Sequence, residues 1–137
     1  MKFLMDNTSC DYSPKIYSSC PKQRFLLMEY IQGENLTQKF ESCGHYFSLK
    51  TMLMVLMELM RLTKEFYTST GLVHVDIKPS NFMVDIKNKI YLIDFGYATA
   101  PNVKLPGQTG TPLFMSQAIQ SQGTICKFSK YIKKFKI

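Results

Sequence analysis

The sequence lacks the residue patterns of secreted, membrane-spanning and zinc-stabilised proteins. Its four cysteines (Cys10, Cys20, Cys43 and Cys126) are scattered without a C-x-x-C spacing, and only two histidines accompany them. A zinc site is therefore not expected. No apolar run approaches the length of a membrane span, and Asp6 follows MKFLM too early for a signal-peptide core. We expect reduced thiols and a cytoplasmic or nuclear location.

Glycine is also absent before Arg24, and no linker rich in proline, glycine or serine divides the 137 residues. Because no repeat or low-complexity run is present either, nothing in the sequence marks an internal domain boundary. The chain is long enough to bury one hydrophobic core. Acidic residues are in the minority, and the formal net charge is +7.

Short runs of strand-forming residues flank the longest helical pattern of the chain. Residues 15–19 and 24–31 are predicted strands joined by a turn, and Gly33 is expected to end the second strand. Residues 82–84 and 89–93 form a second predicted hairpin. Strands followed by a mostly helical part are typical of an α+β fold.

A long amphipathic helix is predicted between the two hairpins. Ser48 is its candidate N-cap, and Gly71 is its candidate C-cap. Large apolar residues recur at helical spacing, and we expect this stripe to lie in the core. The stripe consists of Leu49, Met52, Leu53, Leu56, Met57 and Met60.

Two short segments contain the candidate catalytic and metal-binding residues of the chain. They are His74-Val75-Asp76-Ile77-Lys78-Pro79-Ser80-Asn81 and Tyr91-Leu92-Ile93-Asp94-Phe95-Gly96. A transferring phosphoryl group needs cations and positioning rather than a covalent nucleophile. Asp76 suits a proton acceptor for an attacking hydroxyl, and Lys78 suits a nearby point charge. Asn81 and Asp94 offer the hard oxygen ligands that magnesium prefers. Gly96 is expected to allow a sharp turn after Asp94. Taken singly, either aspartate is better explained as a turn or cap carboxylate; the combination with Lys78, Asn81 and Gly96 favours the nucleotide site.

These two segments resemble the catalytic loop and the magnesium-binding triplet of the eukaryotic-type protein kinase family. HVDIKPSNFMV and IYLIDFGYA are similar to serine/threonine kinases of the casein-kinase-like and spindle-checkpoint-kinase-like kinds. The resemblance implies a partial protein-kinase-like fold: the last small-lobe strands, the hinge and the first half of the helical large lobe. It implies ATP and Mg²⁺ as cofactors, and a structural role for His74.

Further segments match the family where it contacts the nucleotide and the substrate. Residues 24–36 resemble the last small-lobe strand and the hinge, and TGTPLFM (109–115) resembles the segment that receives the substrate. In the second segment, Thr111 is expected to hydrogen-bond toward Asp76 and Lys78. The implied nucleotide contacts are the gatekeeper Met28, the backbone of Glu29 and Ile31 at adenine, Glu34 or Asn35 at the ribose, and Met83 beneath adenine.

Other parts of the family pattern have no counterpart. The Gly-rich phosphate loop and the small-lobe lysine are missing before the hinge, and the closing A-P-E is replaced by Ser116-Gln117-Ala118. Residues 1–123 are therefore expected to form a partial kinase domain, truncated at both ends. Its small-lobe remnant and hinge would be residues 1–31, and its large-lobe part residues 32–123. Val75 replaces the usual arginine, so we expect phosphorylation of the activation segment not to order it through that position.

The resemblance and the missing parts leave two main functional hypotheses. In the first, the chain is a serine/threonine protein kinase that transfers the γ-phosphoryl group of ATP to a protein hydroxyl. In the second, it is a catalytically impaired kinase-like module that acts as decoy, inhibitor or scaffold by binding another kinase or its substrate. A small-molecule kinase of the aminoglycoside or choline type shares an H-x-D…N…D pattern, but Lys78, Gly96 and GTPLFM argue against it.

The basic tail, residues 124–137, allows three interpretations. Its apolar residues Phe128, Tyr131, Ile132 and Phe135 share one helical face among five lysines. This pattern fits a helix for an anionic membrane surface or nucleic acid, for which charge is the only support, or a helix that packs on the large-lobe part. It also fits a tail without a selected role. No specific nucleic-acid partner is expected.

Overall fold

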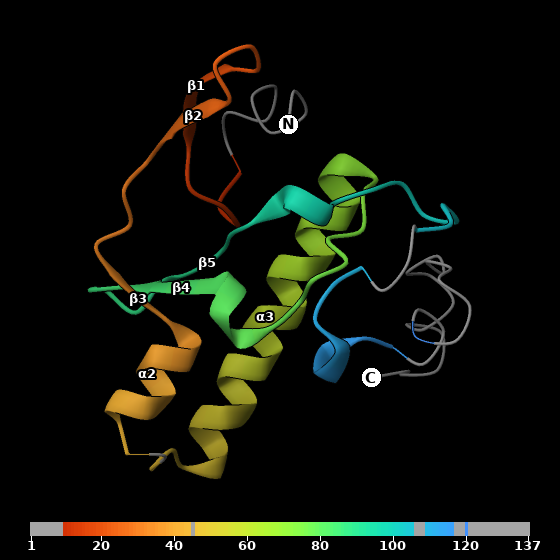
Figure 1. The fold of residues 1–137 in the computed structure, drawn as a ribbon. Helices are drawn as coiled ribbons and strands as arrows, with labels where there is room; N and C mark the ends of the chain where they lie inside the picture. Colours follow the sequence, from red (N-terminus) through yellow and green to blue (C-terminus); the bar gives the residue numbers. More distant parts are fainter. Residues whose placement is uncertain (1–9, 45, 106–108, 117–119, 121–137) are drawn as a thin grey trace. The chain divides into compact units, whose positions relative to one another are not determined.

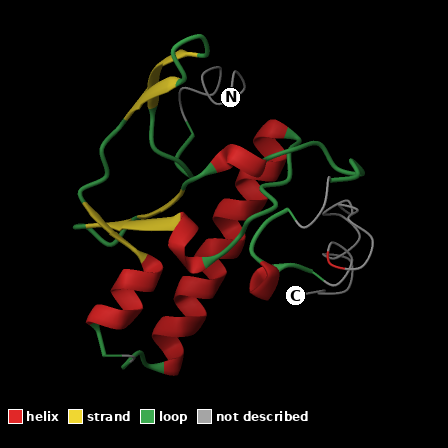
Figure 2. Cartoon of the chain, in the orientation of Figure 1, coloured by secondary structure: helices red, strands yellow, loops and turns green. Residues whose placement is uncertain are grey.

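The computed structural model describes residues 10–44, 46–105, 109–116 and 120 (Figure 1). The basic tail 124–137 and two residues of the A-P-E position, Gln117 and Ala118, lie outside the described residues. The chain divides into two compact units: Met1–Thr63 with Pro79–Ile93, and Lys64–Lys78 with Asp94–Ile137. The helices and strands form the α+β arrangement expected from the sequence (Figure 2).

The first unit contains a two-stranded hairpin, β1 (Ile16–Cys20) and β2 (Phe25–Met28). The strands pair antiparallel, with Cys20 opposite Phe25 and Ile16 opposite Met28. Arg24, the last residue of the turn, has a left-handed φ of 54°. The hairpin confirms the first predicted strand pair, although β2 ends three residues earlier than expected.

A three-stranded antiparallel sheet lies in the same unit, in the order β3 (Gly33–Asn35), β4 (Phe82–Asp85) and β5 (Ile90–Leu92). The β4–β5 hairpin was predicted, but β3 was not. Gly33 does not end a strand; it begins β3. A Cβ atom on Gly33 would stand 1.9 Å from the carbonyl oxygen of Val84, so only glycine allows this close pairing.

Helix α2 (Leu36–Ser42) follows β3 directly and was missed in the sequence. Asn35 caps it: its side chain accepts the N–H of Gln38 at 3.0 Å, and the Gln38 side chain accepts the N–H of Asn35 at 3.0 Å. This reciprocal pair is a capping box, which satisfies two otherwise unpaired N–H groups. Gly44, with φ of 60°, then turns the chain away.

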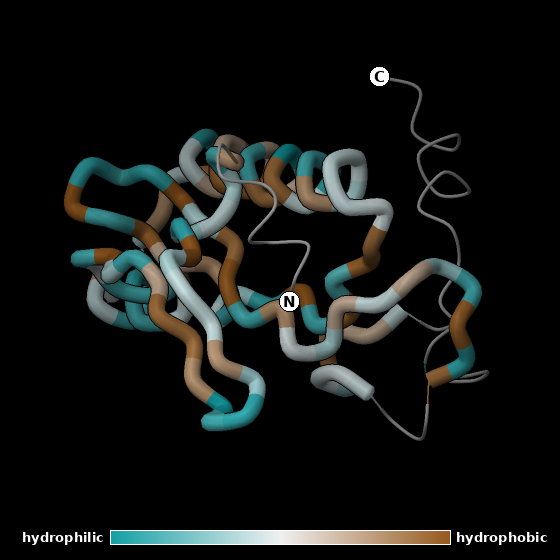
Figure 3. Tube along the Cα trace, turned by 90° about the horizontal axis from the view of Figure 1, so that it is seen from above, coloured by the Kyte–Doolittle hydropathy of each residue, from teal (hydrophilic) through white to brown (hydrophobic). Residues whose placement is uncertain are grey.

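Helix α3 (Leu49–Thr70) has the predicted bounds. The Ser48 hydroxyl oxygen accepts the N–H of Thr51 at 3.1 Å, as expected for an N-cap, and Gly71 leaves the helix with φ of 70°. Hydrophobic residues recur on successive turns of this helix (Figure 3). None of the helices among the described residues is both long and apolar enough to cross a bilayer.

The expectation that the leucine and methionine stripe of α3 lies in the core is wrong. Its six side chains are between 49 % and 70 % exposed. The same helix buries Leu62 and Phe66 completely, on a different face. The periodicity correctly groups the six residues on one face of α3, but the buried face is the one that carries Leu62 and Phe66.

The second unit gathers aromatic rings around the start of the polar segment. His74 is buried, and its ring meets Phe66 at 6.0 Å and Phe95 at 5.3 Å between centroids. Val73 and Thr99 form an antiparallel bridge beside them. This packing agrees with a structural role for His74.

Candidate functional site

Asp76 occupies a buried position on a strained loop of the second unit. Its side chain is 4 % exposed. The preceding residue, Val75, is 9 % exposed and has φ of 75°. A β-branched residue rarely adopts a positive φ, because its side chain crowds the backbone. The fold therefore accepts strain at Val75, and strain of this kind concentrates at functional sites.

Asp76, Lys78 and Thr111 form a closed network. The Lys78 ammonium lies 2.8 Å from Asp76 Oδ2 and donates to the Thr111 hydroxyl at 2.9 Å. The Thr111 hydroxyl donates to Asp76 Oδ1 at 2.8 Å, and the Thr111 N–H donates to the same oxygen at 2.9 Å. These are the contacts expected of Thr111, made across 35 residues of sequence.

The network fixes Asp76 as a carboxylate. Burial alone would raise the pKa of Asp76, but the hydrogen bonds from Lys78 and Thr111 outweigh burial and hold this pKa below its ordinary value. Asp76 is therefore ionised at neutral pH and is a weak proton acceptor. It is better suited to orient a hydroxyl through an acceptor oxygen than to remove its proton early.

Gly110 allows Thr111 to approach this carboxylate. Its φ is 104°, which side chains rarely tolerate. A Cβ atom there would lie 3.3 Å from the Val75 carbonyl oxygen and 3.7 Å from Asp76 Oδ1. The sequence analysis did not identify Gly110 as a site residue, although a glycine directly before Thr111 was a signal that the backbone turns there.

Asp94 carries the sharp turn that was expected of Gly96. Asp94 has φ of 60° and ψ of 70°, in the left-handed region, whereas Gly96 does not have a positive φ. The Asp94 side chain accepts the N–H of Gly96 at 3.4 Å. A Cβ atom on Gly96 would lie 3.2 Å from Asp94 Oδ1, so glycine here leaves room for the carboxylate.

Asn81, the second expected magnesium ligand, belongs to the first unit. It ends a short 3-10 helix, Pro79–Asn81, and is 5 % exposed. Its carbonyl oxygen accepts the N–H of Ile93 at 2.9 Å, which fixes its backbone beside the end of β5. Across the described residues, no three His, Cys, Asp or Glu side chains gather into a metal site. Magnesium at phosphates needs only one or two protein ligands.

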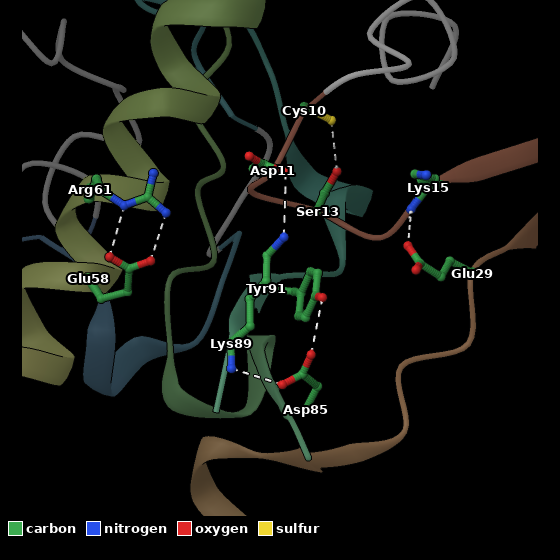
Figure 4. Close-up of polar contacts among 10 residues, drawn as sticks. All are labelled: Cys10, Asp11, Ser13, Lys15, Glu29, Glu58, Arg61, Asp85, Lys89 and Tyr91. Carbon is green, nitrogen blue, oxygen red and sulfur yellow. Dashed lines mark hydrogen bonds and ion pairs between the residues drawn. The ribbon is translucent and has the colours of Figure 1, made fainter. Parts of the chain in front are cut away.

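The hinge segment and the β4–β5 hairpin of the first unit line a cavity of about 500 Å³. Two expected adenine contacts, Glu29 and Ile31, belong to its lining. The backbone N–H of Glu29 donates to the Lys15 carbonyl at 2.7 Å, and the Glu29 carboxylate accepts the Lys15 N–H at 3.0 Å (Figure 4). The Glu29 backbone would therefore accept a hydrogen bond from a base through its carbonyl oxygen.

The hairpin side of this cavity was missed in the sequence. Asp85 accepts the Lys89 N–H at 2.8 Å and the Tyr91 hydroxyl at 3.3 Å (Figure 4). It also accepts the N–H of Lys87 at 2.8 Å. Burial raises the pKa of Asp85, but these hydrogen bonds outweigh it and lower the pKa overall. The Lys89 ammonium lies 4.9 Å from the centroid of the Tyr91 ring.

The remaining expected nucleotide contacts do not line this cavity. Glu34 forms an ion pair with Lys39 at 3.1 Å, and Asn35 caps α2. Met28 is 39 % exposed on β2, and Met83 is half-buried on β4, opposite Asn35. Of the two ribose candidates, Glu34 is the better one, because its exposed ion pair with Lys39 can be exchanged for another contact, whereas the Asn35 side chain caps α2.

Comparison with known proteins identifies the family of this chain. Residues 2–108 match the ABC1 atypical kinase-like domain, and the chain belongs to this family. The expectation of a kinase-like, partial-domain relationship is thereby confirmed.

Individual relatives carry kinase names. A probable casein kinase I homolog of Encephalitozoon cuniculi is 46 % identical over 53 % of this chain and 24 % of its own length. A putative serine/threonine-protein kinase of Homo sapiens is 33 % identical over 89 % of this chain and 44 % of its own length. A probable serine/threonine-protein kinase of Dictyostelium discoideum is 29 % identical over 77 % of this chain and 27 % of its own length. The chain thus spans less than half the length of these relatives.

Proposed function

We propose that this chain is part of a serine/threonine protein kinase domain that transfers the γ-phosphoryl group of ATP to a protein hydroxyl. The closed network of Asp76, Lys78 and Thr111 carries the proposal. A buried carboxylate, an ammonium group and a hydroxyl held within 3 Å of one another suit a reaction that depends on positioned charge.

In the proposed reaction, the substrate hydroxyl oxygen forms a bond to the γ-phosphorus as the bond from that phosphorus to the β–γ bridging oxygen breaks. Asp76 orients the hydroxyl and receives its proton, and ADP leaves. Because its pKa is low, Asp76 receives the proton late in the transfer. Lys78 places its positive charge beside the same phosphoryl oxygens.

Magnesium is the metal that the residue chemistry fits. Asn81 supplies an amide oxygen and Asp94 a carboxylate, and both are hard ligands of the kind that magnesium takes alongside phosphate oxygens and water. When bound, the ion neutralises phosphate charge. The left-handed turn at Asp94 and the close approach of Gly96 support a fixed role for this carboxylate.

For the nucleotide base, we propose contacts from the hinge backbone at Glu29 and Ile31 and from Met28 and Met83. Met83 lies on β4, two residues after Asn81, so one short segment would present both an apolar surface and a metal ligand. Glu34 is the preferred ribose contact. The partner in the reaction is a protein carrying the hydroxyl group that is phosphorylated.

Magnesium-dependent phosphate transfer tests this proposal. Purified chain is incubated with labelled ATP and a generic basic protein, beside an Asp94→Asn variant and an Asp11→Asn control. Asp11 is 82 % exposed, and its 3.5 Å ion pair with Lys89 is a surface contact, so its loss should leave the rate unchanged. Transfer that Asp94→Asn abolishes and Asp11→Asn preserves supports the proposal. Transfer unaffected by Asp94→Asn contradicts it.

The exposed stripe of α3 favours a second candidate function. An exposed apolar patch of this kind commonly marks a protein-binding surface. The chain would then act as a scaffold, decoy or inhibitor that binds another kinase or a kinase substrate. Absence of phosphate transfer, together with retention of a purified kinase on immobilised chain, would favour this alternative.

A further inference from the structure

Tyr91 connects two groups of expected nucleotide contacts in the first unit. Glu29 and Ile31 line the cavity beside the hinge, whereas Met83 lies outside its lining. Tyr91 lines the same cavity and stands directly opposite Met83 in the β4–β5 ladder. Directly opposed residues of an antiparallel pair project from the same face, with Cβ atoms about 4.5–5.5 Å apart. A base that contacts both the hinge backbone and Met83 therefore lies beside the Tyr91 side chain.

The sheet face that carries Tyr91 is the one turned away from the core. Burial alternates along β4 and β5, as expected where only one face of a sheet is packed. Four residues of the other face are buried: Phe82, Val84, Ile90 and Leu92. Met83, Asp85 and Tyr91 are only half-buried. The cavity that Asp85 and Tyr91 line has a volume of about 500 Å³, within the range of small-molecule sites.

We propose that the Tyr91 ring is a base-contact surface, against which the purine of a hinge-bound nucleotide packs. This inference rests on the proposed nucleotide site and extends it to β5. A tyrosine ring offers a flat apolar surface, and a purine base has a large π-face that packs well on aromatic side chains. Met83 would then cover one part of the base, and Tyr91 the part nearer the cavity.

Two neighbouring side chains hold the Tyr91 ring in place before a ligand binds. The Tyr91 hydroxyl donates to Asp85 Oδ2 at 3.3 Å (Figure 4), and the Lys89 ammonium lies 4.9 Å from the ring centroid. Burial raises the pKa of Tyr91, so the hydroxyl keeps the proton that this hydrogen bond needs. Asp85 is itself fixed, because it accepts the Lys89 N–H at 2.8 Å. A side chain that is already ordered loses little conformational entropy on binding.

Calorimetric titration of the full chain with ATP and with CTP, both at saturating magnesium, tests the proposal. Tyr91→Leu removes the ring and should weaken ATP binding about 5- to 100-fold, the range of base–aromatic stacking. Cytosine offers a smaller stacking surface, so CTP should lose less and the preference for ATP over CTP should fall. A merely structural effect would weaken both nucleotides equally. Tyr91→Phe keeps the ring and should bind ATP within about threefold of the wild type.

Tyr46→Leu is the matched control. Tyr46 is 92 % exposed and does not line the cavity, so this variant should bind both nucleotides as the wild type does. Circular dichroism of each variant verifies that the fold is retained.

The outcomes separate this inference from the proposed function. Unchanged ATP affinity in Tyr91→Leu overturns the inference and leaves the proposed phosphate transfer standing. Equal weakening of ATP and CTP overturns it as well, because Tyr91 would then act on the fold rather than on the base. A wild-type chain that binds no ATP up to about 10 mM overturns both the inference and the proposed nucleotide site.

Discussion

Replacing Thr111 by valine removes one hydroxyl from the centre of the candidate site while preserving its shape. Asp76 Oδ1 would lose a hydrogen bond of 2.8 Å, and Lys78 would lose an acceptor at 2.9 Å. A hydrogen bond to a charged group contributes about 1.5–3 kcal/mol, and Asp76 is too buried for water to replace its donor readily. Lys78 is 24 % exposed and keeps its ion pair with Asp76, so its loss is smaller. We expect the free energy of unfolding to fall by about 2–4 kcal/mol.

Chemical denaturation of Thr111→Val and Thr111→Ser measures this effect. Serine retains the hydroxyl, so Thr111→Ser should stay within about 1 kcal/mol of the wild type. NMR titration of the Asp76 carboxyl group should show that its pKa rises in the valine variant and stays low in the serine variant. If both variants lose the same stability and the pKa of Asp76 does not move, the hydroxyl does not hold the network together.

Three further predictions concern the fold around the site. Gly33→Ala should lower the free energy of unfolding by about 3 kcal/mol or more, because its Cβ atom would push β3 away from Val84. In the control Gly71→Ala, the new Cβ atom meets no atom within 4 Å, so the loss should be only about 1 kcal/mol for the positive φ. Similar losses in thermal or chemical unfolding of the two variants would contradict the close pairing of β3 and β4. Asn35→Ala should destabilise the chain by about 0.5–2 kcal/mol through its capping box, and no change in the unfolding midpoint would argue against that box. Because the pKa of Asp76 is lowered in the folded state, its carboxylate contributes stability that is fully present above the pKa of an aspartate in the unfolded chain, about 3.9, and that is lost as the pH falls through the lower folded pKa. The free energy of unfolding of Asp76→Asn should therefore depend less steeply on pH below about 4. An unchanged slope in acid unfolding would refute this linkage.

Much of the fold was predictable where local signals were strong. The bounds of α3 followed from its periodicity, the Ser48 cap and Gly71, and the β4–β5 hairpin followed from its short apolar runs. Helix α2 was missed, although the Asn35 and Gln38 pair that begins it is visible in the sequence as a capping box. Gly33 was interpreted as a breaker, because the sequence does not reveal that another strand approaches its α-carbon.

The chemistry of the site was more predictable than its geometry. The contacts of Thr111 with Asp76 and Lys78 were predicted from the resemblance of the two sequence segments to the family. The positive φ of Val75 and Asp94 was not predictable, because neither residue type favours the left-handed region as glycine does. The exposure of the α3 stripe was not predictable either, because periodicity does not show what covers a face.

The most direct test of the phosphoryl-transfer site is the initial rate of phosphate transfer at saturating magnesium and ATP for Asp76→Asn beside wild type. The substitution preserves the size of the side chain and removes its charge. Loss of a positioned proton acceptor typically lowers the rate about 10²–10⁴-fold, and we expect a decrease in that range without loss of nucleotide binding. A variant that transfers phosphate as fast as the wild type would contradict the assignment of Asp76 to the reaction.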